Sequence, residues 1–401
     1  MQEVLIVGAG IGGLTLALEL HRRRIACRLF ESAPEIKAVG VGINLLPHAT
    51  EVLGALGLEP ALASVAVETA ESVFFNRFGQ LIYQEPLGRR AGYAWPQFSI
   101  HRADLQSVLL EAVQARIGEE RLHPGWHCVG FEQDEAKVRL MFRDRDPVEG
   151  RIAVGCDGIH SVIRKQLYPR EGEPRYSGVN MWRGVTRWKP ILSGASMLRA
   201  GWLATGKLVH YPVRNRIDAE GRQLVNWLWE IETPQYKRWD WNRPARSEDF
   251  IGGAESWRFD WLDVPAFLRA AELVLEYPMV DKDPLPAWSH GRVTLLGDAA
   301  HPMVPRGSNG AGQAILDARA LAECLSEGTD CLKRYEVLRL GPTSNVVLEN
   351  RRNPPDAILR EVYERTGDQP FERIEAVISA QELAALSDRY KQVAGYERKT
   401  P

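Results

Sequence analysis

The chain has 401 residues, enough for more than one ordinary domain with a sizeable core. Its 50 Lys and Arg residues against 52 Asp and Glu residues argue against nucleic acid as a partner. No apolar run approaches the ~18 residues of a membrane span, and the N-terminus enters a predicted strand too soon for a signal peptide. The five cysteines form no C-x-x-C pair, so we expect reduced thiols, no metal site and a cytoplasmic location.

A glycine-rich turn follows the first predicted strand. An apolar strand ends at Gly8, where glycine allows the tight turn, and a helix follows. Gly10 lets a pyrophosphate approach the backbone, and Gly13 lets helix and strand pack closely. A second apolar strand, Cys27 to Phe30, ends at Glu31, where an acid can accept hydrogen bonds from a ribose. This pattern predicts a dinucleotide site; a glycine-rich turn in another kind of α/β protein is the alternative.

The next segments hold a second glycine-containing loop and two predicted helices. Residues 40–44 form a loop whose glycines permit close backbone approach, and a helix is expected from about His48 to Gly57. The stretch Phe98–Leu105 is expected to start another helix, with Arg102 near its beginning. A cation is disfavoured at that end of the helix dipole, so a phosphate or ribose partner would explain Arg102. An ordinary surface arginine is the alternative.

The character of the chain changes between Tyr176 and Trp288. Ten of the 12 tryptophans fall in this region, and segments such as Leu208–Val213 and Leu224–Trp229 have the composition of strands. We therefore expect a second domain built on an antiparallel sheet. A planar aromatic substrate would suit such a wall, although packing inside the domain is the more common use of tryptophan.

The last third returns to an alternation of strand and helix. Gly291–Leu296 reads as a buried strand that ends at Gly297–Asp298, and Gln313–Leu325 reads as an amphipathic helix. The tail beyond Asn350 carries a further helix, which begins with a capping box at Ser379–Glu382 and is expected to stop at Gly395.

Three motifs in this order carry a family resemblance: the turn Gly8–Gly13, then Gly155-Cys156-Asp157-Gly158, then Leu295–Pro302. With them the chain resembles, nearly end to end, the class A flavoprotein monooxygenases, which are aromatic hydroxylases of the p-hydroxybenzoate and salicylate hydroxylase type. It is most similar to their phenazine-carboxylate hydroxylase subgroup. The resemblance implies an α/β fold with a Rossmann-like FAD-binding domain in two parts (1–175 and 289–350), an inserted antiparallel-sheet substrate domain (176–288) and a C-terminal helical segment (351–401).

The resemblance also implies FAD as cofactor and NADH or NADPH as co-substrate. The positions that would hold FAD are Gly8, Gly10, Ile11, Gly12, Gly13, Glu31, Gly42, Arg102, Asp157, Asp298, Pro305, Gly307, Asn309 and Gly310. The loop from Pro305 to Gly310 would lie along the isoalloxazine, where a following helix N-terminus suits the negative charge of reduced flavin. Since the chain has only one G-x-G-x-x-G motif, NAD(P)H would bind without a Rossmann domain of its own.

By this resemblance NAD(P)H reduces FAD, and a flavin C4a-hydroperoxide formed with O2 hydroxylates a small aromatic or heteroaromatic ring. Decarboxylation is one outcome if the ring carries a carboxylate. His210 is the candidate base, with a hydrogen-bonded sheet histidine as the alternative. The expected substrate contacts are Trp182, Arg183, Tyr211 and Arg306. The two arginines suit a carboxylate, and a solvent-facing side chain is the alternative for Arg306. A flavin-dependent dehydrogenase without oxygen insertion is the runner-up, and the protein is expected to be a monomer or homodimer.

Overall fold

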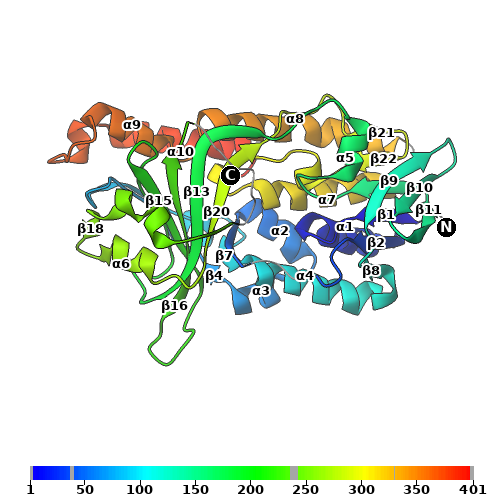
Figure 1. Cartoon of the computed structure of the whole chain (residues 1–401), viewed down its shortest axis with the longest axis horizontal. Helices are drawn as coiled ribbons and strands as arrows, with labels where there is room; N and C mark the ends of the chain where they lie inside the picture. The colour runs from blue at the N-terminus through cyan, green and yellow to red at the C-terminus, as the bar shows by residue number, and fades with distance from the viewer. Residues whose placement is uncertain (1–2, 37–39, 235–242, 329, 398–401) are drawn as a thin grey trace.

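A computed structural model of the chain describes residues 3–36, 40–234, 243–328 and 330–397. Two large sheets form its two halves, with the long helix α8 (Cys331–Arg352) beside both (Figure 1). The half that holds the N-terminus contains a six-stranded sheet, and the other half contains an eight-stranded sheet. The expected α/β architecture is confirmed.

The six-stranded sheet is parallel except at one edge, because the chain returns to it through helices. Its strands, in spatial order, are β21 (Ser289–His290), β22 (Val293–Leu295), β12 (Ile152–Gly155), β1 (Val4–Val7), β2 (Cys27–Glu31) and β8 (Leu122–Pro124). The helices of this half include α1 (Ile11–Arg22), α4 (Arg102–Ile117), α5 (Val162–Leu167) and α7 (Gly310–Ser326). Strands β1 and β12 are buried along their whole length, as expected of central strands in a parallel sheet.

The eight-stranded sheet is mainly antiparallel. Its spatial order is β17 (Arg243–Ala245), β20 (Val274–Asp281), β13 (Arg175–Trp188), β16 (Gln223–Glu232), β15 (Gly206–Arg214), β14 (Ser196–Trp202), β5 (Glu71–Phe75) and β6 (Leu81–Pro86). Strands β5 and β6 bring residues from the first expected FAD-binding segment into this sheet; the domain boundaries themselves stay predictions. One face of the sheet packs Trp227 and Trp229 against Trp257 and a short helix, α6 (Val264–Arg269). These tryptophans are core residues.

Smaller sheets complete the fold. A three-stranded sheet contains β3 (Gly42–Leu45), β7 (Phe98–His101) and β4 (Val67–Glu68), and it lies near α2 (Pro47–Ala55) and α3 (Glu59–Val65). Another contains β9 (Cys128–Gln133), β10 (Val138–Phe142) and β11 (Arg145–Gly150), and a two-stranded ribbon pairs β18 (Arg258–Phe259) with β19 (Leu262–Asp263). The prediction that Phe98 already belongs to a helix is wrong. Phe98–His101 instead pairs antiparallel with β3, and the helix begins at Arg102.

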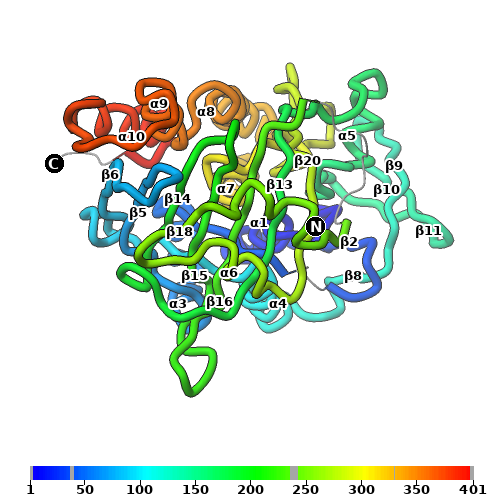
Figure 2. The backbone as a smooth tube through the Cα atoms, turned by 60° about the vertical axis from the view of Figure 1, so that its left-hand side comes forward, coloured from blue at the N-terminus to red at the C-terminus, as the bar shows by residue number. Residues whose placement is uncertain are grey.

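The C-terminal helices pack against the eight-stranded sheet. α9 (Ala357–Thr366) and α10 (Ala380–Ala394) lie beside β5 and β6 (Figure 2), where Phe74 and Ile82 meet Ile358 and Leu383 in one apolar cluster. The predicted capping box of α10 and its stop at Gly395 are confirmed. The tail therefore covers the sheet of its own chain.

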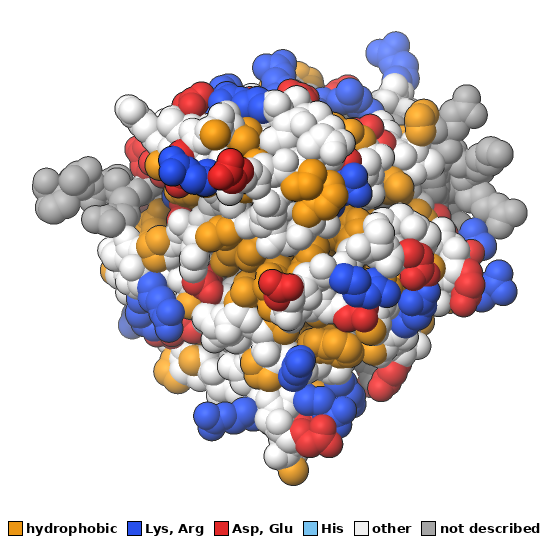
Figure 3. All heavy atoms as spheres, turned by 90° about the vertical axis from the view of Figure 1, so that its left-hand side faces the viewer, with side chains coloured by type: hydrophobic (Ala, Val, Ile, Leu, Met, Phe, Trp, Pro, Cys, Tyr) orange, Lys and Arg blue, Asp and Glu red, His pale blue; other side chains and the backbone are white. Residues whose placement is uncertain are grey.

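The surface carries mixed charge. Basic and acidic side chains are spread among hydrophobic ones on the end of the molecule shown in Figure 3. Within the described ranges, none of the helices combines the length and the apolar character needed to span a bilayer.

Candidate flavin and substrate site

One cavity of about 640 Å³ extends from the glycine turn after β1 to the eight-stranded sheet. Gly8, Gly10, Ile11 and Gly12 line one end of it. Since α1 begins at Ile11 and its first N–H groups have no partner within the helix, this end is suited to hold phosphate oxygens.

The glycines of the turn have separate roles. Gly8 has a φ of +102°, and a Cβ added to it would lie 2.5 Å from the carbonyl oxygen of Cys156. A Cβ on Gly13 would lie 2.0 Å from the carbonyl oxygen of Gly8, so Gly13 permits the contact of helix and strand and does not line the cavity. A Cβ on Gly10 would meet nothing within 4 Å, because that position faces the open cavity.

These differences predict opposite results for two alanine variants. Gly8→Ala should lower the free energy of unfolding of the FAD-free protein by about 2 kcal/mol or more, because the left-handed φ and the Cys156 contact both oppose a side chain. Gly10→Ala should leave that free energy unchanged and weaken FAD binding by about tenfold, or ~1.4 kcal/mol. Denaturant unfolding and FAD titration measure the two effects. Unchanged FAD affinity of Gly10→Ala would contradict this role for the turn.

Glu31 lies at the end of β2, where the sequence predicted it. Its Oε2 accepts a hydrogen bond from the N–H of Ala9 at 2.9 Å, and its Oε1 accepts one from Ala33 at 2.9 Å. These bonds fix the carboxylate beside the glycine turn at the cavity wall. A ribose hydroxyl is the partner that such a carboxylate has in dinucleotide sites.

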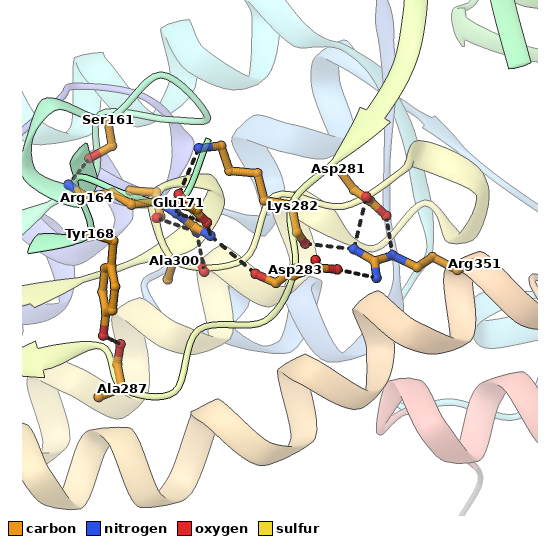
Figure 4. Close-up of polar contacts among 11 residues, drawn as sticks. Ser161, Arg164, Tyr168, Glu171, Asp281, Lys282, Asp283, Ala287, Ala300 and Arg351 are labelled. Carbon is orange, nitrogen blue, oxygen red and sulfur yellow. Dashed lines mark hydrogen bonds and ion pairs between the residues drawn. The ribbon is translucent and has the colours of Figure 1, made fainter. Parts of the chain in front are cut away.

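Asp157 lines the cavity and also anchors the start of α5. It accepts hydrogen bonds from Ser161 Oγ (2.5 Å) and from the N–H of Val162 (2.8 Å), and burial raises the pKa of its carboxyl group. In the first turn of α5, the buried Arg164 donates to the carbonyl oxygens of Ala299 and Ala300, at 3.0 and 2.7 Å. Figure 4 shows Arg164 reaching this turn. The Gly155–Gly158 motif is thereby tied to the Gly297–Asp298 motif.

The remaining expected FAD contacts surround the middle of the cavity. Gly42, Arg102, Asp298, Pro305, Asn309 and Gly310 all line it. Gly307 does not: a Cβ there would lie 1.5 Å from Tyr390 Oη, so this glycine lets α10 pack against the flavin loop. The first turn of α7 begins at Gly310 and faces the same cavity. Two helix N-termini and an elongated cavity fit a dinucleotide with a ring system at one end.

Arg183, Tyr211 and Arg306 line the part of the cavity next to the eight-stranded sheet. Arg183 donates to the carbonyl oxygen of Gly42 at 3.1 Å, while its Nε and that of Arg306 are buried without a hydrogen-bond partner among the described residues. Burial raises the pKa of Tyr211, which is therefore a neutral phenol. Three of the four expected substrate contacts thus lie together.

Trp182 and His210 do not lie there, and their expected roles need correction. Trp182 stacks on Phe250 and His210 packs against Phe267, both on the face of the sheet turned away from the cavity. Neither residue lines the cavity. The cause is the alternation of side chains along a strand: β15 turns Tyr211 toward the cavity, so His210 points the other way. Burial lowers the pKa of His210 to about 4, which keeps the ring neutral.

This placement predicts that His210→Phe keeps kcat and its pH profile within about threefold of the unmodified protein. Neither ring nitrogen of His210 has a hydrogen-bond partner among the residues that the structure describes, so an apolar ring fits the site. A histidine with a folded pKa near 4 loses stability as pH falls from 6.5 toward 4, because the unfolded chain takes up the proton first. The stability of His210→Phe should therefore fall by about 2 kcal/mol less between pH 7 and pH 4.5 than that of the unmodified protein, measured by denaturant unfolding at both pH values. A hundredfold fall in kcat would restore His210 as a catalytic residue.

A buried ionic cluster at the sheet end of the cavity was missed by the sequence analysis. Arg199, Lys207, Glu230 and Asp356 all line the cavity, and each is at most 6% exposed. Lys207 Nζ lies 2.7 Å from Glu230 Oε2 and also contacts Asp356, whose Oδ1 lies 3.1 Å from Arg199 Nε. Burial opposes ionisation of Asp356, but the charges of Lys207 and Arg199 outweigh it and lower the pKa of that carboxyl group.

Comparison with known proteins identifies the family. A family model described as an FAD binding domain matches residues 1–193 and 280–337. The phenazine 1,6-dicarboxylic acid hydroxylase of Lysobacter antibioticus is 41% identical over 362 residues, covering 87% of this chain and 89% of that protein. The chain belongs to the class A FAD-dependent aromatic monooxygenases.

Two further comparisons agree. This monooxygenase is 32% identical to the 3-amino-4-hydroxybenzoate 2-monooxygenase of Streptomyces cremeus, over 98% of its own length and 96% of that protein. It also matches the structure of a salicylate hydroxylase substrate complex with a TM-score of 0.75 and 25% identity, covering 99% and 96% of the two chains. The predictions of an enzyme, of FAD as its cofactor and of aromatic hydroxylation are confirmed.

Proposed function

We propose that this monooxygenase hydroxylates a small aromatic or heteroaromatic ring that carries a carboxylate, with NADH or NADPH as the reductant. The related proteins named above act on a phenazine dicarboxylic acid and on an aminohydroxybenzoate. When bound, FAD supplies the oxygen-insertion chemistry, and the protein binds and orients the ring and excludes water.

The charge balance at the sheet end of the cavity is the observation that carries this proposal. Among the described residues, Arg183, Arg199, Lys207 and Arg306 line this end, against two carboxylates, those of Glu230 and Asp356. Arg199 and Lys207 are neutralised within the ionic cluster, whereas Arg183 and Arg306 have no carboxylate partner among the described residues. Both arginines are half-buried and each has a fully buried Nε, so an anionic substrate group would stabilise their charge.

Apolar side chains complete the substrate end. Met197, Val209 and Leu228 line the cavity beside Tyr211, on the same face of strands β14, β15 and β16. They offer flat apolar contact to a ring whose carboxylate lies on Arg183 or Arg306. If the hydroxyl enters at the ring carbon that bears the carboxylate, the C–C bond breaks and CO2 leaves, so decarboxylation depends on how the ring is oriented.

The test uses the FAD-loaded protein with NADH or NADPH, a panel of aromatic and heteroaromatic acids, and ¹⁸O2. We expect stimulated O2 uptake and a product that contains one ¹⁸O atom by mass spectrometry. Carboxamide analogues of the same rings serve as the control and should react far more slowly. An oxidised product without ¹⁸O would support the dehydrogenase alternative instead. A cytoplasmic location and a monomeric or homodimeric state stay predictions.

A further inference from the structure

A second cavity of about 310 Å³ adjoins the flavin and substrate cavity and shares Arg306 with it. Its walls come from the start of β13, the turn between β14 and β15, the end of β16 and the segment that joins α8 to α9. Four arginines line it, against one carboxylate, that of Glu232; we call it the arginine pocket. The other three arginines are Arg351, Arg352 and Arg360.

Most of this positive charge is not neutralised by the protein. Arg351 is paired with Asp281 and Asp283, at 2.6 and 2.7 Å (Figure 4). By contrast, Arg306, Arg352 and Arg360 have no carboxylate partner among the described residues. Arg360 donates to two neutral oxygens, the carbonyl oxygen of Arg352 and Oδ1 of Asn353, each at 3.3 Å. Arg352 and Arg360 therefore remain available to an anion in this pocket, and Arg306 joins them when the substrate carboxylate lies on Arg183.

We propose that the arginine pocket binds the phosphate groups of NADH or NADPH. This inference rests on the proposed function, which requires such a reductant. A ring carboxylate is satisfied by one guanidinium, whereas several that converge suit a ligand with several negative charges, and arginine binds phosphate oxygens in a bidentate manner.

The position of the arginine pocket supports this ligand over a second substrate molecule. Arg306 belongs to the loop Pro305–Gly310 at the flavin cavity, so a dinucleotide held at the pocket has its other end within reach of the flavin. The volume of about 310 Å³ holds only part of a dinucleotide, so the phosphates and an adjoining ribose are the groups assigned to it. The chain also has a single G-x-G-x-x-G motif, so the reductant needs a different phosphate site.

The test is the double variant Arg352→Gln/Arg360→Gln, loaded with FAD and titrated with NADP+, NAD+ and 2′,5′-ADP by calorimetry. We expect dissociation constants to rise by about tenfold or more, because two charge-assisted contacts are lost. An equal rise for NADP+ and NAD+ assigns the pocket to the pyrophosphate. A rise for NADP+ and 2′,5′-ADP alone assigns it to the 2′-phosphate. Lys165→Gln/Arg170→Gln is the matched control, since it removes two exposed charges that line neither cavity.

Unchanged dissociation constants for all three ligands would overturn the assignment. So would weaker binding of the aromatic acid alone, because the pocket would then serve the substrate. Incorporation of ¹⁸O by the unmodified protein does not depend on either result, so it tests the proposed function separately from the arginine pocket. Should the double variant not fold, inorganic pyrophosphate must compete with NADP+ or NAD+ on the unmodified protein, and absence of competition would equally reject the proposal.

Discussion

Lys207→Met should lower the free energy of unfolding by about 3–5 kcal/mol, measured by denaturant titration at neutral pH. Lys207 is 1% exposed and is the only cation paired with Glu230 among the described residues. Removing the ammonium group leaves a carboxylate buried without its counter-ion, which costs far more than the lost contact itself. Asp356 keeps its ion pair with Arg199, so the loss of stability comes mainly from the unpaired carboxylate of Glu230.

Two further variants separate this cause from simple loss of packing. Adding Glu230→Leu to Lys207→Met should recover most of the lost stability, because the unpaired carboxylate is removed as well. Lys137→Met is the matched control: Lys137 is paired with Glu149 at the same distance of 2.7 Å but is 38% exposed. Lys137→Met should lower the free energy of unfolding by less than about 1 kcal/mol. If the single variant lost no more than this control, the cluster would not be an ion pair that the fold depends on.

Arg183→Gln should lower kcat/KM for a ring carboxylate by about 100-fold, since truncating one partner of a buried charge pair costs roughly 2–5 kcal/mol. Its activity toward the carboxamide analogue should change by less than about threefold, because a neutral group gains little from the guanidinium. Steady-state kinetics on both substrates measures the difference. The expected loss rests on the position of Arg183 on β13, with its side chain in the cavity and its Nε unpaired.

Arg187→Gln provides the control for this prediction. Arg187 lies on the same strand, is 57% exposed and contacts Glu272 at 3.7 Å outside the flavin cavity. It should leave kcat/KM unchanged for both substrates. Equal losses on the carboxylate and the carboxamide in Arg183→Gln would show that Arg183 acts only through the hydrogen bond to Gly42.

The sequence predicted the cofactor end of the site better than the substrate end. The role of Gly8 follows from backbone geometry, and Glu31 follows from the strand that precedes it, so a local pattern is sufficient for both. The direction of a side chain on a strand is harder to predict. Successive side chains point to opposite faces of the sheet, and no local pattern shows which face lines the cavity. If Tyr211 is a substrate contact, the alternation of side chains along the strand already excludes its neighbour His210 from the same face. The same reasoning excludes Trp182 once Arg183 is chosen.

The ionic cluster lay beyond local patterns for another reason. Lys207 and Glu230 meet because β15 and β16 pair, with Lys207 opposite Glu230 in the register. Asp356 reaches them from the segment before α9, about 150 residues further along the chain. The sequence does contain one indication of the cluster, namely a charged residue inside a strand of otherwise apolar residues. Such a residue is buried only when it has a partner of opposite charge.

The segment before α9 has one more consequence. The family model matches residues 1–193 and 280–337, which leaves Arg199, Lys207, Glu230 and Asp356 outside the matched part. Arg183 and Arg306, the two arginines proposed to hold the substrate carboxylate, lie inside the matched part, whereas the ionic cluster beside them lies outside it. A protein that shares only the matched part with this chain would keep these two arginines and the FAD-binding motifs, and could differ in the ionic cluster that closes the sheet end of the cavity.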